Sequence, residues 1–188
     1  DLHYPLRRQR QMCIRDSTYA AEAAKSQSLH VIEAVFKFTA NQEKEHGKIF
    51  YNFLKEMTGE NITIDGSYPV DIYDDVLKLL RSAQHNEFEE FEPVYPDFAA
   101  VANQEGFTNI GAKFNQIAKI EKTHGDRFGM FADLLEQGKL FVSDVEEEWM
   151  CLNCGYVHKS SEAPKSCPVC SHPQGYFVRL KLAPFTTL

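Results

Sequence analysis

Four cysteines of the chain form two pairs with the same internal spacing, Cys151 with Cys154 and Cys167 with Cys170. A gap of two residues lets both thiolates of a pair reach one ion, and two such pairs complete a tetrahedral tetrathiolate shell. A disulfide framework is the alternative, but the chain has only one other cysteine and enough length for an ordinary hydrophobic core. The spacing therefore predicts a metal site, and both zinc and iron accept four thiolates.

Three further pairs of metal-binding residue types occur at a spacing of three: Glu43 with His46, Glu87 with Glu90, and Glu121 with His124. Residues three apart share one face of a helix, and each pair lies on an apolar stripe, so all six side chains would point into a helical bundle. A single Glu-x-x-His motif more often belongs to a solvated face, but two copies beside an inward acidic pair rarely arise by chance. Unpaired buried charges are costly, and two divalent or trivalent cations would remove that cost.

Long helices must position these pairs, and the sequence predicts them over residues 28–57, 72–103 and 108–137. Apolar residues recur at heptad-like steps in each range, as on the inward faces of a bundle. A glycine follows the end of each range, which is typical of a helix C-terminus. Pro93 and Pro96 come just after the acidic pair of the second range, and because each lacks a backbone donor, we expect that helix to loosen there.

The composition of the chain argues against two classes of partner. The 188 residues are 43% apolar and 25% charged, which suits a globular protein with one main domain and a small appendage. The formal net charge of −7 argues against a general nucleic-acid binder. No apolar run approaches the roughly 20 residues that a transmembrane helix needs. We therefore expect a cytoplasmic protein with no nucleic-acid or membrane partner.

From about residue 17 to residue 178 the sequence resembles the rubrerythrin family. In the helical part the matching motifs are Asn41-Gln-Glu43-Lys-Glu-His46, Glu87-Phe-Glu-Glu90, Tyr95-Pro-Asp-Phe98, Glu105-Gly-Phe107 and Ile117-Ala-Lys-Ile-Glu121-Lys-Thr-His124. At the C-terminal end, a segment that resembles a shortened rubredoxin module carries Cys151-Leu-Asn-Cys154-Gly-Tyr-Val-His158, Cys167-Pro-Val-Cys170 and His172-Pro-Gln-Gly-Tyr-Phe177.

The resemblance implies a mainly α fold with two parts. A ferritin-like four-helix bundle, with a truncated first helix, would occupy residues 17–145. A small rubredoxin-like metal-binding domain would follow over residues 146–182, with a tail over 183–188. Residues 1–16 have no match to the family and resemble translated adapter sequence, and a basic leader is the alternative interpretation.

The resemblance also implies two non-haem irons in the bundle. Glu43 and Glu121 would bridge the two irons, while Glu87 and His124 would bind one of them. One ligand of the family has no counterpart here, because a glutamate of the first helix would fall near Arg10. We therefore expect the chain as written to hold iron weakly or asymmetrically, which iron counting on the expressed protein would check.

Three residues are candidate catalytic residues by the same resemblance. Glu90 and His46 would alternate as ligands of the other iron when its redox state changes, and Tyr95 would donate a hydrogen bond beside the site. The four cysteines would hold one redox-active iron, and a structural zinc is the alternative at that position.

The activity implied is the reduction of hydrogen peroxide to water, a defence against oxidative stress. Electrons would come from an external rubredoxin or reductase and pass through the tetrathiolate iron, and the family resemblance implies a head-to-tail homodimer. A ferritin-like iron oxidase or storage protein is one alternative. A non-enzymatic helical domain with a structural zinc ribbon is the other.

Overall fold

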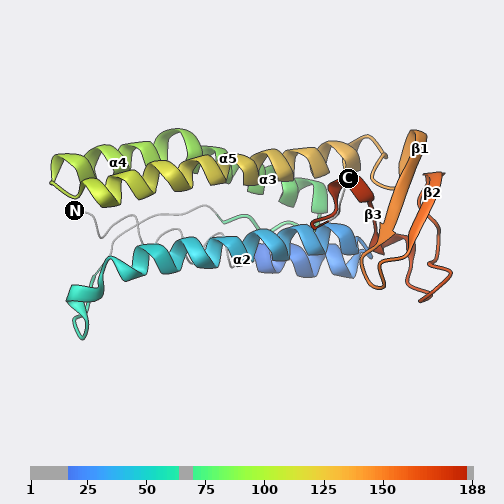
Figure 1. Ribbon diagram of the computed structural model, residues 1–188, viewed down its shortest axis with the longest axis horizontal. Helices are drawn as coiled ribbons and strands as arrows, with labels where there is room; N and C mark the ends of the chain where they lie inside the picture. Colours follow the sequence, from blue (N-terminus) through green and yellow to red (C-terminus); the bar gives the residue numbers. More distant parts are fainter. Residues whose placement is uncertain (1–16, 64–69, 186–188) are drawn as a thin grey trace.

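The computed structural model describes residues 17–63 and 70–185, and within them a bundle of helices is joined at one end to a small three-stranded sheet (Figure 1). The predicted mainly α fold with a small C-terminal unit is confirmed. The expected leader over 1–16, the position of Arg10 and the last residues of the expected tail lie outside the described residues. No helix in the described ranges is both long and apolar enough to cross a bilayer.

The first long helix of the structure, α2, spans His30–Asn52 and follows a helical segment over residues 17–26. It is shorter than the predicted range of 28–57. Ser28 has a φ of 60°, in the left-handed region, so the helix cannot include it. At the other end the hydrogen bonds change to i→i−3 spacing, and a 3₁₀ turn, η1 (Lys55–Met57), takes the place of the last predicted turn.

The second predicted helix is three consecutive helical pieces: α3 (Val76–Glu89), the π-helical segment η2 (Glu90–Val94) and α4 (Tyr95–Gln104). It begins four residues later than predicted because the Asp75 carboxylate accepts hydrogen bonds from the backbone amides of the first turn. The π-helical segment contains Pro93, which has no amide hydrogen to donate. The predicted loosening is therefore present as a local widening of the helix that begins at Glu90, the second residue of the acidic pair.

The third predicted helix is confirmed as α5 (Thr108–Glu136), against which α3 and α4 pack along their length (Figure 1). Two apolar clusters fill the bundle. One lies near the sheet and includes Phe36 and Phe128, and the other includes Phe50 and Phe114. On α2 and α5 the two Glu-x-x-His pairs lie between these two clusters. Apolar layers therefore lie on both sides of the polar residues.

The small sheet has the strand order β2-β1-β3, with β1 (Val142–Cys151) antiparallel to both β2 (Val157–Glu162) and β3 (Phe177–Arg179). Its buried centre is Trp149, whose ring lies 4.9 Å from the Arg179 guanidinium. Cys151 is the last residue of β1 and pairs with Phe177, the first residue of β3, so the sheet sets the position of the first cysteine pair.

The sheet unit docks on the start of α2 through a short turn that contains Gly175. The rings of His30 and Tyr176 stack with their centroids 4.0 Å apart. A Cβ at Gly175 would lie only 1.8 Å from the carbonyl oxygen of Ser28. The close approach of the two backbones therefore requires glycine at this position.

Gly175→Ala is expected to destabilise the protein by about 1–3 kcal/mol, because a rigid backbone oxygen blocks the added methyl group. Urea unfolding of wild type and variant would measure the loss. Gly129→Ala is the matched control, since its Cβ would meet the side-chain amide of Gln84, which can move, and alanine also favours the helix. Equal effects of the two substitutions would contradict the docking role of Gly175.

Candidate metal centres

All six predicted ligands of the bundle are buried, with exposed fractions of 6% or less. They come from three sides of the bundle: Glu43 and His46 from α2, Glu87 and Glu90 from α3 and η2, and Glu121 and His124 from α5. The i, i+3 spacing within each pair places both members on the inward face, as the sequence predicted.

Four of these residues converge on one point, with ligand atoms of Glu43, Glu87, Glu121 and His124 all within 4.8 Å of one another. His124 Nδ1 lies 2.8 Å from Glu43 Oε1 and 3.0 Å from Glu121 Oε2. The same nitrogen lies 3.5 Å from Glu87 Oε2. Glu87 and Glu121 lie 44 and 78 positions after Glu43 in the chain. The structure therefore brings three distant carboxylates around a single imidazole nitrogen.

His46 contacts two of the same carboxylates, those of Glu43 and Glu121. Its Nδ1 lies 3.1 Å from Glu121 Oε1 and 3.4 Å from Glu43 Oε1. The two imidazole rings stack with centroids 5.6 Å apart and an interplanar angle of 13°. Glu43 and Glu121 thus lie between two histidines, which is the placement that two metal ions sharing two carboxylates would need.

Glu90 and Tyr95 are buried at the two ends of the π-helical region. Glu90 is the first residue of η2, one turn after Glu87, and it does not belong to the four residues that converge within 4.8 Å. Tyr95 is 1% exposed, and its ring lies 5.7 Å from that of Phe114. Alternation of Glu90 between two positions and hydrogen bonding by Tyr95 to the site stay predictions.

The converging atoms lack the hydrogen bonds that buried polar atoms normally make. Among the described residues, both carboxylate oxygens of Glu121, one oxygen each of Glu43 and Glu87, and Nδ1 of both histidines have no partner with hydrogen-bond geometry. Ionised carboxylates repel one another and cannot donate hydrogen bonds, so their convergence needs either metal cations or bound protons. Oxygen and imidazole donors from facing helices suit a pair of iron ions, so the residues present fit the di-iron site.

Protons take the place of cations in the metal-free protein. Burial opposes charge on His46, but the carboxylates of Glu121 and Glu43 outweigh it and raise its pKa to about 9. Burial likewise opposes charge on His124, and Glu121 and Glu43 raise its pKa to about 11. Burial, reinforced by the charge of Glu43, raises the pKa of Glu87 to about 8. The pKa of Glu43 moves down to about 2, because the two histidines outweigh its burial.

The metal-free protein is therefore expected to lose stability as the pH rises. A histidine with a raised folded pKa stabilises below its ordinary pKa of 6.5, and for His46 this contribution disappears as the pH approaches 9. Glu87 also lowers the stability of the folded protein as the pH rises, because its buried carboxyl loses its proton toward pH 8. The loss from His46 alone is on the order of 3 kcal/mol.

Urea unfolding of the metal-free protein at pH 6 and pH 9 would measure this loss. His46→Gln should flatten the dependence on pH, whereas His85→Gln, at an exposed position, should leave it unchanged. Equal stability of the wild type at the two pH values would show that the buried histidines do not carry the charge inferred here.

The four cysteines form the second candidate centre, with all four sulfur atoms within 4.8 Å of one another. Cys151 and Cys167 are buried, whereas Cys154 is exposed. The Sγ–Sγ distances are 3.7 Å between Cys151 and Cys170 and 3.6 Å between Cys154 and Cys167. Four sulfurs this close, without a disulfide, are arranged as a tetrathiolate site requires.

The two cysteine pairs lie in turns of the same shape. Gly155 follows the first pair with a φ of 77°, and Ser171 follows the second with a φ of 61°. Each of these residues donates its amide to the carbonyl of the first cysteine of its pair, at 2.8 and 2.9 Å. The backbone amide of His172 lowers the pKa of the Cys170 thiol to about 6, against the effect of burial. Such amides stabilise the thiolates that bind a metal.

The sequence did not point to the polar residues behind His124. Its Nε2 lies 3.1 Å from Gln42 Oε1, and the Arg127 guanidinium donates to the same oxygen. Gln42 directly precedes a predicted ligand, and Arg127 comes three residues after His124 on the same helical face. That spacing is the only sequence signal that could have indicated them.

Comparison with known proteins gives matches over both parts of the chain. The family model described as Rubrerythrin matches residues 17–132, and the model described as Rubrerythrin, rubredoxin-like domain matches residues 149–178. A rubrerythrin of Clostridium perfringens is 43% identical over 161 residues, which cover 85% of this chain and 83% of that protein. A rubrerythrin of Porphyromonas gingivalis is 43% identical over 164 residues, covering 87% and 80% of the two chains.

Solved structures of nigerythrin have a similar fold. The partially reduced state aligns with a TM-score of 0.59 and 25% identity, covering 91% of this chain and 80% of that chain. The fully reduced, all-ferrous state aligns with a TM-score of 0.55 and 25% identity, covering 94% and 86%. The similar structures thus include an iron protein, in agreement with the donor atoms of both centres.

Proposed function

Because the chain belongs to the rubrerythrin family, we propose that it is a peroxidase that reduces hydrogen peroxide to water in the bundle, with electrons relayed through the four-cysteine centre. The observation that supports this most is the convergence of buried carboxylate oxygens and imidazole Nδ1 atoms that have no partner with hydrogen-bond geometry among the described residues. A second, thiolate-rich centre in the same chain gives that site a source of single electrons.

The six buried residues would hold the irons, with Glu43 and Glu121 shared between them. When bound, the irons would supply two electrons and Lewis-acid polarisation to the O–O bond. One molecule of hydrogen peroxide also takes up two protons and yields two molecules of water. The apolar clusters on both sides of the ligands exclude bulk water, which limits the site to small molecules and to protons held by its own residues.

The four-cysteine centre has the exposure that an electron relay needs. Cys154 is exposed, and the neighbouring Val169 is 66% exposed, so an external donor can approach the sulfur atoms. On its other side the unit rests on α2 through Tyr176 and His30. We propose that an external rubredoxin or reductase donates electrons here, and that the protein works as a head-to-tail homodimer in the cytoplasm.

Two observations disfavour the alternatives. A ferritin-like iron oxidase or store has no need of a tetrathiolate centre, and a zinc ribbon on an interaction domain does not explain six buried ligand residues. The test is an assay of the iron-loaded protein with rubredoxin and its reductase as the electron source. We expect a coloured ferric tetrathiolate that bleaches on reduction and recovers when peroxide is added. A colourless, redox-silent centre, or recovery with dioxygen but not with peroxide, would favour the alternatives.

A further inference from the structure

Gln42 contacts the ring nitrogen of His124 that faces away from the metal-binding atoms, and Arg127 and Thr39 extend this hydrogen-bond network. His124 Nε2 lies 3.1 Å from Gln42 Oε1. Arg127 Nη1 also lies 3.1 Å from Gln42 Oε1 and 2.8 Å from Thr39 Oγ1. Gln42 and Thr39 come from α2 and Arg127 comes from α5, so the group joins the two helices that carry the Glu-x-x-His motifs.

The chemistry of these groups requires a hydrogen on Nε2 of His124, both in the charged imidazolium of the metal-free protein and in the neutral form that can bind a metal. A guanidinium can only donate, so the Gln42 atom that faces Arg127 must be the carbonyl oxygen and not the amide nitrogen. That oxygen can only accept, so the hydrogen bond to His124 requires a hydrogen on Nε2. A neutral imidazole with Nε2–H has its lone pair on Nδ1, which is the atom that faces Glu43, Glu87 and Glu121.

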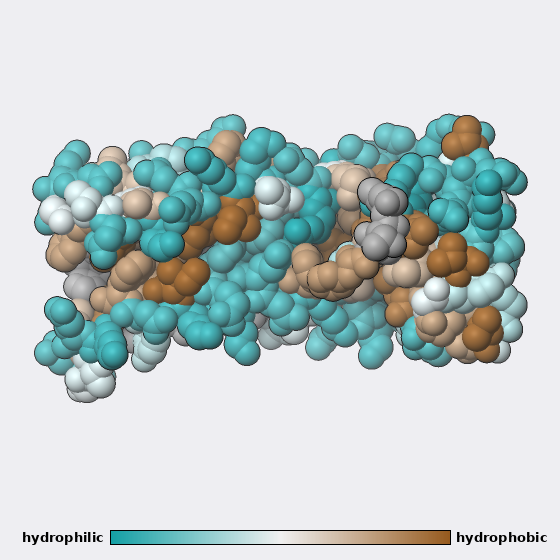
Figure 2. All heavy atoms as spheres, viewed as in Figure 1, coloured by the Kyte–Doolittle hydropathy of each residue, from teal (hydrophilic) through white to brown (hydrophobic). Residues whose placement is uncertain are grey.

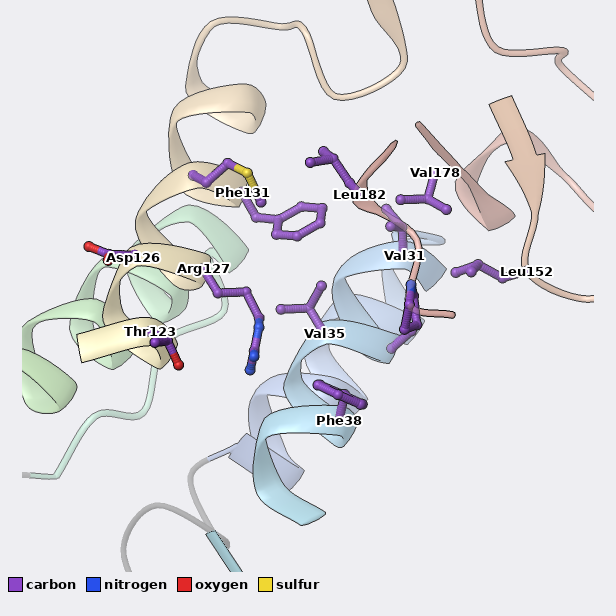
Figure 3. A pocket seen from close by; sticks show the side chains of 13 residues that line it. Val31, Val35, Phe38, Thr123, Asp126, Arg127, Phe131, Leu152, Val178 and Leu182 are labelled. Carbon is purple, nitrogen blue, oxygen red and sulfur yellow. The ribbon is translucent and has the colours of Figure 1, made fainter. Parts of the chain in front are cut away.

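The surroundings of Arg127 hold it in this orientation. Its side chain extends from α5 toward α2 at the edge of a pocket of about 490 Å³ between the bundle and the sheet unit (Figure 3). The pocket is lined mainly by apolar side chains, and tan and brown apolar atoms lie beside teal ones where the bundle meets the sheet unit in Figure 2. The guanidinium also lies 5.0 Å from the centre of the Phe38 ring. Hydrogen bonds in such an apolar setting are stronger than hydrogen bonds in water.

We propose that Gln42 is a positioning residue that keeps the lone pair of His124 on Nδ1 for metal binding, and that Arg127 acts by fixing the orientation of the Gln42 amide. Without Arg127 the amide could rotate and present its NH₂ group to Nε2. That contact would favour a hydrogen on Nδ1, directed at the carboxylates and against a metal ion. The proposal rests on the proposed function only in requiring that the bundle binds metal.

Anaerobic Fe²⁺ titration, with the four-cysteine centre already filled, would test the role of Gln42. Gln42→Leu keeps most of the volume and removes the acceptor, and we expect about a 10–100-fold loss of Fe²⁺ affinity in the bundle. Gln116→Leu on α5 is the matched control, because this glutamine is exposed and its side-chain oxygen accepts a hydrogen bond from the exposed Lys113, away from the metal-binding residues. Unchanged affinity in Gln42→Leu, or equal losses in both variants, would overturn the proposal.

A spectroscopic measurement separates positioning from a general structural effect. In ¹⁵N-labelled protein loaded with Zn²⁺, wild type should show a protected Nε2–H signal for His124. Gln42→Leu should lose that protection, and Gln42→Glu, which keeps an acceptor, should restore it. A wild-type signal from Nδ1–H, or the same Nε2–H protection in Gln42→Leu, would contradict the inferred tautomer.

A double-mutant cycle tests whether Arg127 acts through Gln42. Arg127→Met should lower Fe²⁺ affinity by less than Gln42→Leu, and the double variant should lose no more than Gln42→Leu alone. Additive losses would show that Arg127 acts independently, and would overturn that part of the proposal. If Gln42→Leu does not fold, Arg127→Met and Gln42→Glu still decide the matter through the His124 signal. Failure of wild type to bind Fe²⁺ or Zn²⁺ in the bundle would instead refute the proposed function itself.

Discussion

Glu121→Gln is expected to abolish peroxide reduction while leaving the four-cysteine centre intact. Glu121 is fully buried, and its two oxygens lie 3.1 Å from His46 Nδ1 and 3.0 Å from His124 Nδ1. An amide in its place keeps the volume but removes the charge that both metal positions would share. The stabilisation that a bound metal gives to a transition state is worth several kcal/mol, so the rate should fall about 10³-fold or more.

The matched control for this variant is Glu89→Gln, the same substitution at an exposed position just before the π-helical segment. It should bind iron and turn over as wild type does. Iron analysis and the visible spectrum would show whether the loss in Glu121→Gln is confined to the bundle. Wild-type turnover in Glu121→Gln would exclude the bundle cluster as the site of the reaction.

Cys167→Ser should have the opposite pattern of effects. Cys167 is 2% exposed, and its sulfur lies 3.6 Å from that of Cys154, so a hydroxyl there breaks the tetrathiolate shell. We expect loss of the tetrathiolate colour and a fall of donor-driven turnover to the rate without protein. A bundle that has been reduced chemically should still react with one equivalent of peroxide at the wild-type rate.

Cys13→Ser, at the one cysteine outside the two pairs, is the control for this effect. It should keep both the colour and the turnover. Donor-driven turnover that survives in Cys167→Ser would mean that electrons reach the bundle by another path. The relay part of the proposed function would then be wrong, while the peroxidase part would stand.

Much of the site could be predicted because its chemistry is local in the sequence. The i, i+3 spacing of Glu121 and His124 fixes their common face on any helix, and the two-residue gap between Cys151 and Cys154 fixes a turn. The apolar stripe that contains each pair then indicates that it faces inward. The mainly α fold and the presence of two metal-binding centres followed from these patterns, and the family was indicated by the resemblance of the quoted motifs.

The parts that sequence reasoning missed depend either on local hydrogen bonds, which the apolar pattern does not report, or on contacts between distant residues. The helix start at Val76 is set by the Asp75 side chain, and the end at Asn52 by a change to 3₁₀ hydrogen bonds, neither of which the apolar stripe encodes. Pro93 indicated a disturbance but not its form as a π-helical turn. The pairing of Gln42 with Arg127 requires knowing which faces of α2 and α5 meet.

The central claim, that the bundle reduces peroxide by two electrons, is tested most directly by an anaerobic titration of the fully reduced protein with hydrogen peroxide. We expect each molecule of peroxide to remove two electrons from the protein and to yield only water, in the absence of dioxygen, and we expect Glu121→Gln to lose this reaction. A reduced protein that stays reduced in the presence of peroxide, or that reoxidises only with dioxygen, would contradict it.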